Sequence, residues 1–269
     1  MPRMDGRDAW FDGSRWWEDS RYALGLLTRL PFGTAAPPDG DFALAMRAFP
    51  IAGIVLGLLT GLLFAIAIEL GLSVFLAATI AVAGAMLMTG CFHEDGLADT
   101  ADGLGGGPTA EAKLLIMRDS RLGTYGACAV IIAVLLRIGA IIEISDFGGW
   151  ANIIVVLAAS GAWSRALMVR LLGSLPPARS DGLSAAAGTP DTRIIRQALA
   201  LGGIMAGLLT IWSFGLFAGL VALLAAYIAY LLVRRLANKH IGGQTGDIAG
   251  AVQQASEIAF LLAIAAALP

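Results

Sequence analysis

Successive apolar stretches of about 20 residues constrain this chain more than any other feature, because a helix of that length crosses the hydrocarbon core of a membrane. Hydrophobic residues make up 58% of the chain and charged residues 14%, whereas a soluble domain is about a quarter charged. The predicted fold class is therefore all-α, a polytopic membrane bundle. Seven spans are expected, at 51–70, 72–92, 123–144, 151–172, two within 194–233 that separate near Gly215, and 248–268.

The distribution of basic residues predicts the orientation of these spans. The connections near Gly71, Ser145–Trp150 and Gly215 contain no lysine or arginine, whereas the long polar loops at about 93–122, 173–193 and 234–247 contain many. Under the positive-inside rule, the polar loops and the N-terminus face the cytoplasm. We therefore expect an integral protein of the bacterial cytoplasmic membrane with its active site on the cytoplasmic side. The net charge of −2 excludes nucleic acid as an expected partner.

The N-terminal part differs in composition from the apolar remainder. Ala23, Leu26, Leu27 and Leu30 form a helical stripe that ends at Pro31, with tryptophans upstream. This pattern predicts a helix lying in the membrane interface, and a solvated helix packed on the bundle is the alternative. We expect residues 1–46 to form a cytoplasmic or interfacial segment and residues 47–269 to form the membrane-embedded domain.

The two cysteines, Cys91 and Cys128, lack the spacing of a metal-ligand pair. We expect them to be buried as small apolar residues rather than joined in a disulfide.

An acidic motif follows the second apolar stretch and contains four acids within nine residues, from Glu94 to Asp102. On a helix continuing from that stretch, Asp95, Asp99 and Asp102 are spaced i, i+4 and i+7 and share one face. Carboxylates at such short distances repel each other, and this repulsion favours a divalent counter-ion. Hard oxygen ligands suit magnesium, calcium or manganese. The glycine-rich stretch 103–107 that follows is expected to be either a lid-like loop or a plain connector.

A second polar motif spans residues 113–126. Arg118 and Arg121 are three residues apart, share a helical face and could bind phosphate oxygens bidentately. Asp119 between them could complete a metal shell. The alternative is that these arginines are ordinary anchors at the cytoplasmic surface.

A third polar motif precedes the last span. Asp247 is either a helix N-cap or a site residue, and Glu257 is an acid within the membrane. Arg165 lies too deep to reach the surface freely and is expected to face the acids. Arg137 lies deep in the third span, and the sequence assigns it no role.

Four stretches together resemble the cobalamin synthase family, the adenosylcobinamide-GDP ribazoletransferases. The resemblance covers about residues 20–268 and rests on residues 49–53, 93–103, 117–126 and 243–251. It implies the joining of adenosylcobinamide-GDP with α-ribazole or its 5′-phosphate, with release of GMP, as the last joining step of vitamin B12 assembly. It also implies magnesium as the cofactor. Membrane lipid and a second copy of the chain, in a homo-oligomer, are further expected partners.

The motifs and the resemblance together define the candidate site. The expected catalytic residues are Asp99 and Asp102; the expected metal ligands are Asp95, Asp99, Asp102 and Asp119; the expected substrate-binding residues are Lys113, Arg118, Ser120, Arg121, Asp247 and Arg165; and further candidates are His93, Glu94 and Glu257.

Two other functions remain open from the sequence. A CDP-alcohol-type lipid head-group phosphotransferase also places aspartates at a membrane helix end, but its motif has Asp-Gly followed by Ala-Arg, whereas Asp95-Gly96 is followed here by Leu97 and Ala98. A metal or proton transporter would place its acids near the middle of the bilayer. Here the acids cluster beside basic residues at an inner helix end, which favours an enzyme.

Overall fold

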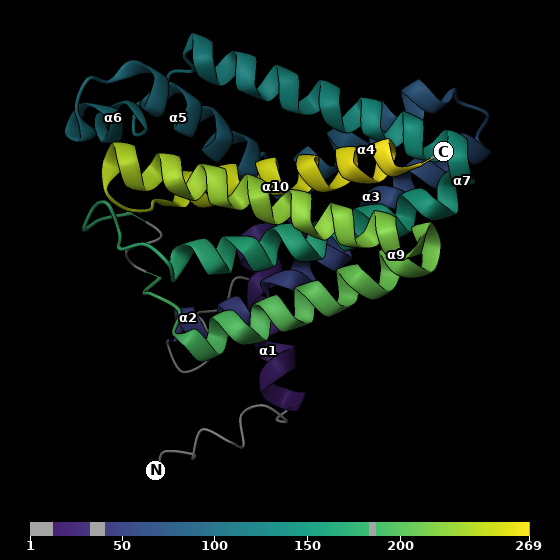
Figure 1. Ribbon diagram of the computed structural model, residues 1–269, viewed down its shortest axis with the longest axis horizontal. Helices are drawn as coiled ribbons and strands as arrows, with labels where there is room; N and C mark the ends of the chain where they lie inside the picture. Colours follow the sequence, from purple (N-terminus) through teal and green to yellow (C-terminus); the bar gives the residue numbers. More distant parts are fainter. Residues whose placement is uncertain (1–12, 33–40, 183–186, 269) are drawn as a thin grey trace.

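The computed structural model describes residues 13–32, 41–182 and 187–268. In these ranges the chain forms helices and one isolated β-bridge, between Pro177 and Gln244. Most of the long helices run along the long axis of the molecule (Figure 1). The elements are α1 (Gly13–Leu27), α2 (Phe42–Ala45), the 3-10 helix η3 (Met46–Ala48), α3 (Phe49–Glu69), α4 (Val74–Thr89), α5 (Phe92–Gly106), α6 (Ala110–Ile116), α7 (Thr124–Leu172), α9 (Thr192–Ile241) and α10 (Gly246–Ala267).

The described helices confirm the all-α membrane fold. Four helical segments are long and apolar enough to cross a membrane, namely Phe42–Glu69, α7, α9 and α10, and the bent pair α4–α5 would make a fifth. Helices α7 and α9 contain 49 and 50 residues, about twice the length of one crossing. Each is interrupted by a glycine with positive φ, Gly149 in α7 and Gly215 in α9. The two halves of each helix run in opposite directions (Figure 1). Seven crossings therefore stay a prediction, and the break expected near Gly215 is confirmed.

The sequence suggested that the acidic motif continues the preceding helix, but the structure shows a break between the two. Helix α4 ends at Thr89, Gly90 and Cys91 both have positive φ values of 63° and 58°, and α5 leaves at 88° to α4. Because left-handed conformations end a helix, the acids lie on a helix of their own. The glycine-rich stretch is no lid, since it is helical through Gly106.

The expected burial of the cysteines is wrong. Cys91 lies at this break and Cys128 lies in the second turn of α7, and both thiols are exposed and free. Cys91 is exposed because the chain turns there between two helices.

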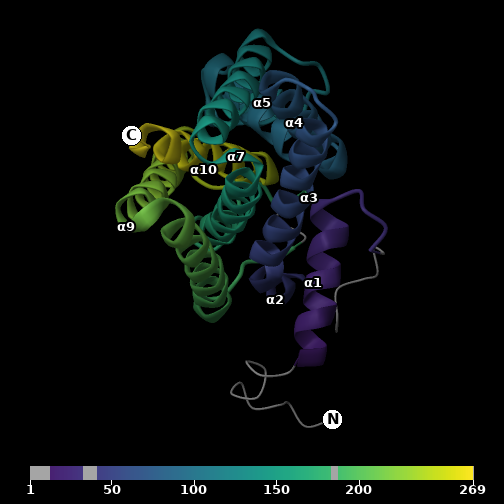
Figure 2. The ribbon, with the colours of Figure 1, turned by 90° about the vertical axis from the view of Figure 1, so that its right-hand side faces the viewer.

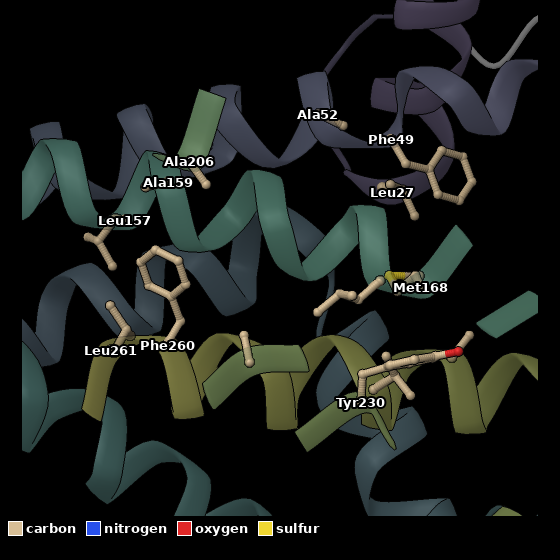
Figure 3. Close-up of a cluster of buried hydrophobic side chains, with 14 of the residues drawn as sticks. Leu27, Phe49, Ala52, Leu157, Ala159, Met168, Ala206, Tyr230, Phe260 and Leu261 are labelled. Carbon is tan, nitrogen blue, oxygen red and sulfur yellow. The ribbon is translucent and has the colours of Figure 1, made fainter. Parts of the chain in front are cut away.

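Small residues bring α3 and α7 into close contact. Gly53, Gly57 and Gly61 are spaced by four on one face of α3, and a Cβ on Gly53 would lie 2.1 Å from the carbonyl oxygen of Gly161. Such spacing lets two membrane helices pack backbone to backbone. Larger side chains fill the core on both sides of this contact, with Leu27, Phe49 and Met168 at one end and Leu157, Phe260 and Leu261 at the other (Figure 3).

Helix α1 packs against α3 (Figure 2). Ala23 and Leu27 of the predicted stripe are buried against the bundle, and Asp19 is held by Arg47 at 2.7 Å. The apolar stripe therefore faces protein, as in the alternative of a helix packed on the bundle. An interfacial location of α1 and the domain boundary at residue 46 stay predictions.

Candidate active site

The polar loops gather at one end of the molecule, where α5, α6, the segment after α7 and the turn between α9 and α10 lie (Figure 1). Helices α5 and α10 cross there in close contact. A Cβ on Gly96 would lie 2.9 Å from the carbonyl oxygen of Asp247 and 3.2 Å from the Cα of Gly250. Because only glycines permit this approach, Asp95 and Asp99 on α5 come beside Asp247 on α10.

These acids repel each other. Burial, together with the negative charges of Asp95, Asp247 and Asp102, raises the pKa of Asp99 to about 7. Asp99 is half-buried and Asp95 is exposed, so these carboxylates lie at the edge of the bundle rather than in its core. Asp247 is not the N-cap, since the hydroxyl of Thr245 caps α10 by accepting from the amide of Ile248. The excess of negative charge around Asp95, Asp99 and Asp247 favours binding of a cation.

Asp102 has a different environment from the other aspartates of α5. Its two carboxylate oxygens accept hydrogen bonds from the backbone amides of Gly123, at 2.8 Å, and Gly126, at 2.9 Å. These amides belong to the first turn of α7, whose donors have no partner within the helix. A Cβ on either glycine would overlap the carboxylate. Asp102 therefore caps α7 from a neighbouring helix. The absence of a side chain at Gly123 and Gly126 leaves room for its carboxylate.

Replacing Asp102 by alanine should lower the free energy of unfolding by about 1–2 kcal/mol, the usual cost of losing a helix cap. Thermal unfolding of the purified protein in detergent would measure this. Asp102→Asn keeps one acceptor oxygen and should cost less. An unchanged unfolding midpoint in Asp102→Ala would show that the cap contributes nothing.

The expected metal ligands do not converge as one group. Among the residues that the structure describes, no three histidine, cysteine, aspartate or glutamate side chains are close enough to hold a metal ion. Asp102 is committed to α7, and Asp119 is bound by Arg121, whose Nη2 lies 2.5 Å from Oδ2. Hydrogen bonds from Arg121 lower the pKa of Asp119 to about 2. Metal binding itself stays a prediction.

Most of the expected phosphate-binding residues lie on the exposed surface at the rim of the polar end. Arg118 pairs with Asp181, and both side chains are about half exposed, while Arg121 is 86% exposed. Ser120 is also exposed. Lys113 is buried, and its Nζ donates to the carbonyl oxygen of Leu104 at 2.6 Å, near the C-terminal end of α5. Lys113 therefore fastens α6 to α5, and a role in substrate binding stays a prediction.

Arg165 faces an acid, as expected, but this acid is Glu257 in the interior rather than the aspartates of α5. Its Nη1 lies 2.7 Å from Glu257, which also contacts Arg137 at 3.3 Å, and Arg137 lies 2.9 Å from Glu94. We call Glu94, Arg137, Arg165 and Glu257 the buried quartet, since each side chain is 8% exposed or less. Two acids and two bases balance in charge, as burial requires. The quartet joins α5, α7 and α10 and gives Arg137 a role.

A cavity of about 30 Å³ borders the quartet and is also lined by His93 and Gln254. His93 is 1% exposed and also lies in the interior. The candidates His93, Glu94 and Glu257 are therefore interior residues, and Glu94 and Glu257 join helices through the quartet.

Arg179 is the site residue that sequence reasoning missed. Its Nη2 lies 3.3 Å from Oδ2 of Asp247, and its positive charge acts on Asp99. Nothing in the local sequence identifies Arg179 as a site residue. It lies in a loop after two prolines, and this loop is far from the acids in the sequence. Its proximity arises from the β-bridge between Pro177 and Gln244, with hydrogen bonds from Ala178 N to Gln244 O at 2.8 Å and from Gln244 N to Pro176 O at 2.9 Å.

The fold and this site define a helical membrane protein with a group of acids at the crossing of α5 and α10, at its polar end. The family model for cobalamin-5-phosphate synthase matches residues 19–265, and the chain therefore belongs to that family. It is 47% identical to a relative from Bradyrhizobium diazoefficiens over 92% of this chain and 93% of the relative.

Two further relatives support the same family. One from Azorhizobium caulinodans is 42% identical over 93% of this chain and 96% of its own length. One from Rhizobium etli is 40% identical over 93% of this chain and 97% of its own length. All three are named adenosylcobinamide-GDP ribazoletransferase, which confirms the resemblance seen in the motifs. No solved structure matches the chain.

Proposed function

We propose that this chain is a membrane-bound adenosylcobinamide-GDP ribazoletransferase. It joins adenosylcobinamide-GDP with α-ribazole, or its 5′-phosphate, and releases GMP in the last joining step of vitamin B12 assembly. The names of the relatives support this reaction. The observation that carries the proposal is the meeting of Asp95 and Asp99 with Asp247 at the glycine contact between α5 and α10.

The reaction exchanges one phosphate ester for another. The ribose 3′-hydroxyl oxygen forms a bond to the cobinamide-linked phosphorus, the bond from that phosphorus to the bridging oxygen breaks, and GMP leaves with the bond's electron pair. The hydroxyl proton needs a base. Both oxygens of Asp102 are engaged by amides, so we assign the base to the carboxylate of Asp99. Arg118 and Arg121 at the rim remain proposed contacts for the diphosphate.

We further propose that the activity depends on magnesium, held by Asp95 and Asp247. Magnesium commonly binds one or two carboxylates and completes its shell with substrate phosphates and water, so a preformed cage of protein ligands is not needed. The mutual repulsion of the acids around Asp99 supports a cation at this place. When bound, the ion neutralises charge on the diphosphate.

An assay of the purified chain in liposomes tests both proposals. With adenosylcobinamide-GDP and α-ribazole we expect release of GMP, its loss in excess chelator and its recovery with added magnesium. Absence of GMP release from folded protein would reject the transferase. Full activity in chelator would reject the metal dependence. Release of CMP from a CDP-alcohol lipid would instead identify a lipid head-group phosphotransferase.

We also propose that the polar end faces the cytoplasm of the bacterial inner membrane, because the basic residues gather there. Ser180 lies at the polar end and Ser145 lies near the kink of α7. In a chain with Cys91→Ser and Cys128→Ser, a membrane-impermeant thiol reagent added to whole cells should label Ser145→Cys and not Ser180→Cys. Labelling of Ser180→Cys alone would place the site on the outside.

A further inference from the structure

Arg179 is held in place by a loop that is fastened on two sides. The β-bridge fixes residues 176–178 to Gln244, just before α10, and a Cβ on Gly243 would lie 2.4 Å from the carbonyl oxygen of Pro176. On the other side, Asp181 pairs with Arg118 from the segment between α6 and α7. The backbone that carries Arg179 is thus set before any ligand arrives.

The guanidinium of Arg179 has unused donors. Its Nη2 contact with Asp247 is long, at 3.3 Å, and its Nε and Nη1 atoms are buried without a hydrogen-bond partner. Buried donors without an acceptor cost free energy unless an arriving group supplies one. The side chain is 17% exposed, so it still has an opening towards solvent. Arginine offers planar pairs of donors that match the oxygens of a phosphate.

Four other arginines at this end and in the interior already pair with acids. Arg118 and Arg121 pair with exposed acids at the rim. Arg137 and Arg165 belong to the buried quartet. Arg179 differs from these four because it stands against Asp247, beside the carboxylates of α5, and two of its nitrogens are buried without a partner.

We propose that Arg179 binds the diphosphate of the nucleotide-activated substrate, drawing it to the acids at the α5–α10 crossing. This inference rests on the proposed transferase function. Arg179 would then bind the diphosphate beside Asp247, one of the acids proposed to hold the cation. Asp247 holds the guanidinium until the phosphate oxygens replace part of that contact.

Steady-state kinetics of the full chain in liposomes test the inference. Arg179→Gln should raise the KM for adenosylcobinamide-GDP, and the inhibition constant of added GDP, by about 10- to 100-fold, the usual effect of losing charge-assisted hydrogen bonds. The KM for α-ribazole should stay unchanged. Arg179→Lys keeps a positive charge beside Asp247 but loses the fork, so it should fold normally and show a smaller increase in the same two constants.

Arg234→Gln is the matched control. Arg234 fastens the start of the same segment by donating to the hydroxyl of Ser174 at 3.1 Å and to its carbonyl oxygen at 3.4 Å, but it does not contact the acids. Its loss should lower stability and leave both KM values unchanged. If the wild-type chain is active and neither Arg179 variant changes the KM for adenosylcobinamide-GDP, Arg179 only supports the loop. A wild-type chain that releases no GMP would instead reject the transferase function itself.

Discussion

Replacing Asp99 by asparagine should lower kcat by about a hundredfold or more while the protein remains folded in the membrane. The substitution keeps the size of the side chain and removes its charge. Groups that act directly on the reacting atoms commonly contribute a factor of this order. Asp99 is the carboxylate on which the charges of Asp95, Asp247 and Arg179 act together, so its loss changes the electrostatics of the whole crossing.

Initial rates of GMP release at saturating substrate measure this effect, with folded protein quantified by size-exclusion chromatography. Glu111→Gln is the control, because Glu111 is an exposed acid in the first turn of α6, at the same end of the molecule. Its rate should equal that of the wild type. A normal kcat in Asp99→Asn would reject Asp99 as the general base and leave the acidic crossing without a catalytic role.

Replacing Arg137 by methionine should destabilise the protein by about 3–5 kcal/mol. Arg137 links Glu94 on α5 to Glu257 on α10, and removal of one partner leaves a buried charge uncompensated. The quartet fixes α5 against α10. Without Arg137, the aspartates at the α5–α10 crossing should therefore also lose their positions relative to one another. Activity is therefore expected to fall together with stability.

Unfolding midpoints in detergent test this second prediction. The double variant Glu94→Gln, Arg137→Met should be less destabilised than the sum of the two single variants, since neither charge then remains without the other. Arg170→Met, in the last turn of the same helix, is the control for loss of an arginine from α7. An unchanged midpoint in Arg137→Met, or strict additivity in the double variant, would show that the buried pair does not stabilise the fold.

The sequence alone determined the class of fold and the polar end of the molecule. Apolar length and the absence of lysine and arginine from the three short connections are local properties, and the membrane acts on them segment by segment. The kink at Gly215 could also be predicted, because the apolar stretch 194–233 is too long for a single membrane crossing. The motifs around Asp95, Arg118 and Asp247 also suffice to recognise the family, as the relatives confirm.

The tertiary structure decided which of these polar side chains meet. Spacing on a single helix placed Asp102 with Asp95 and Asp99, yet Asp102 turns to the amides of α7, because helix ends left without partners compete for carboxylates. Only the glycine contact between α5 and α10 brings Asp247 to the acids. Only the β-bridge brings Arg179 to Asp247. The last two contacts join residues about 70 to 150 positions apart, and no local pattern in the chain encodes a pairing over that distance.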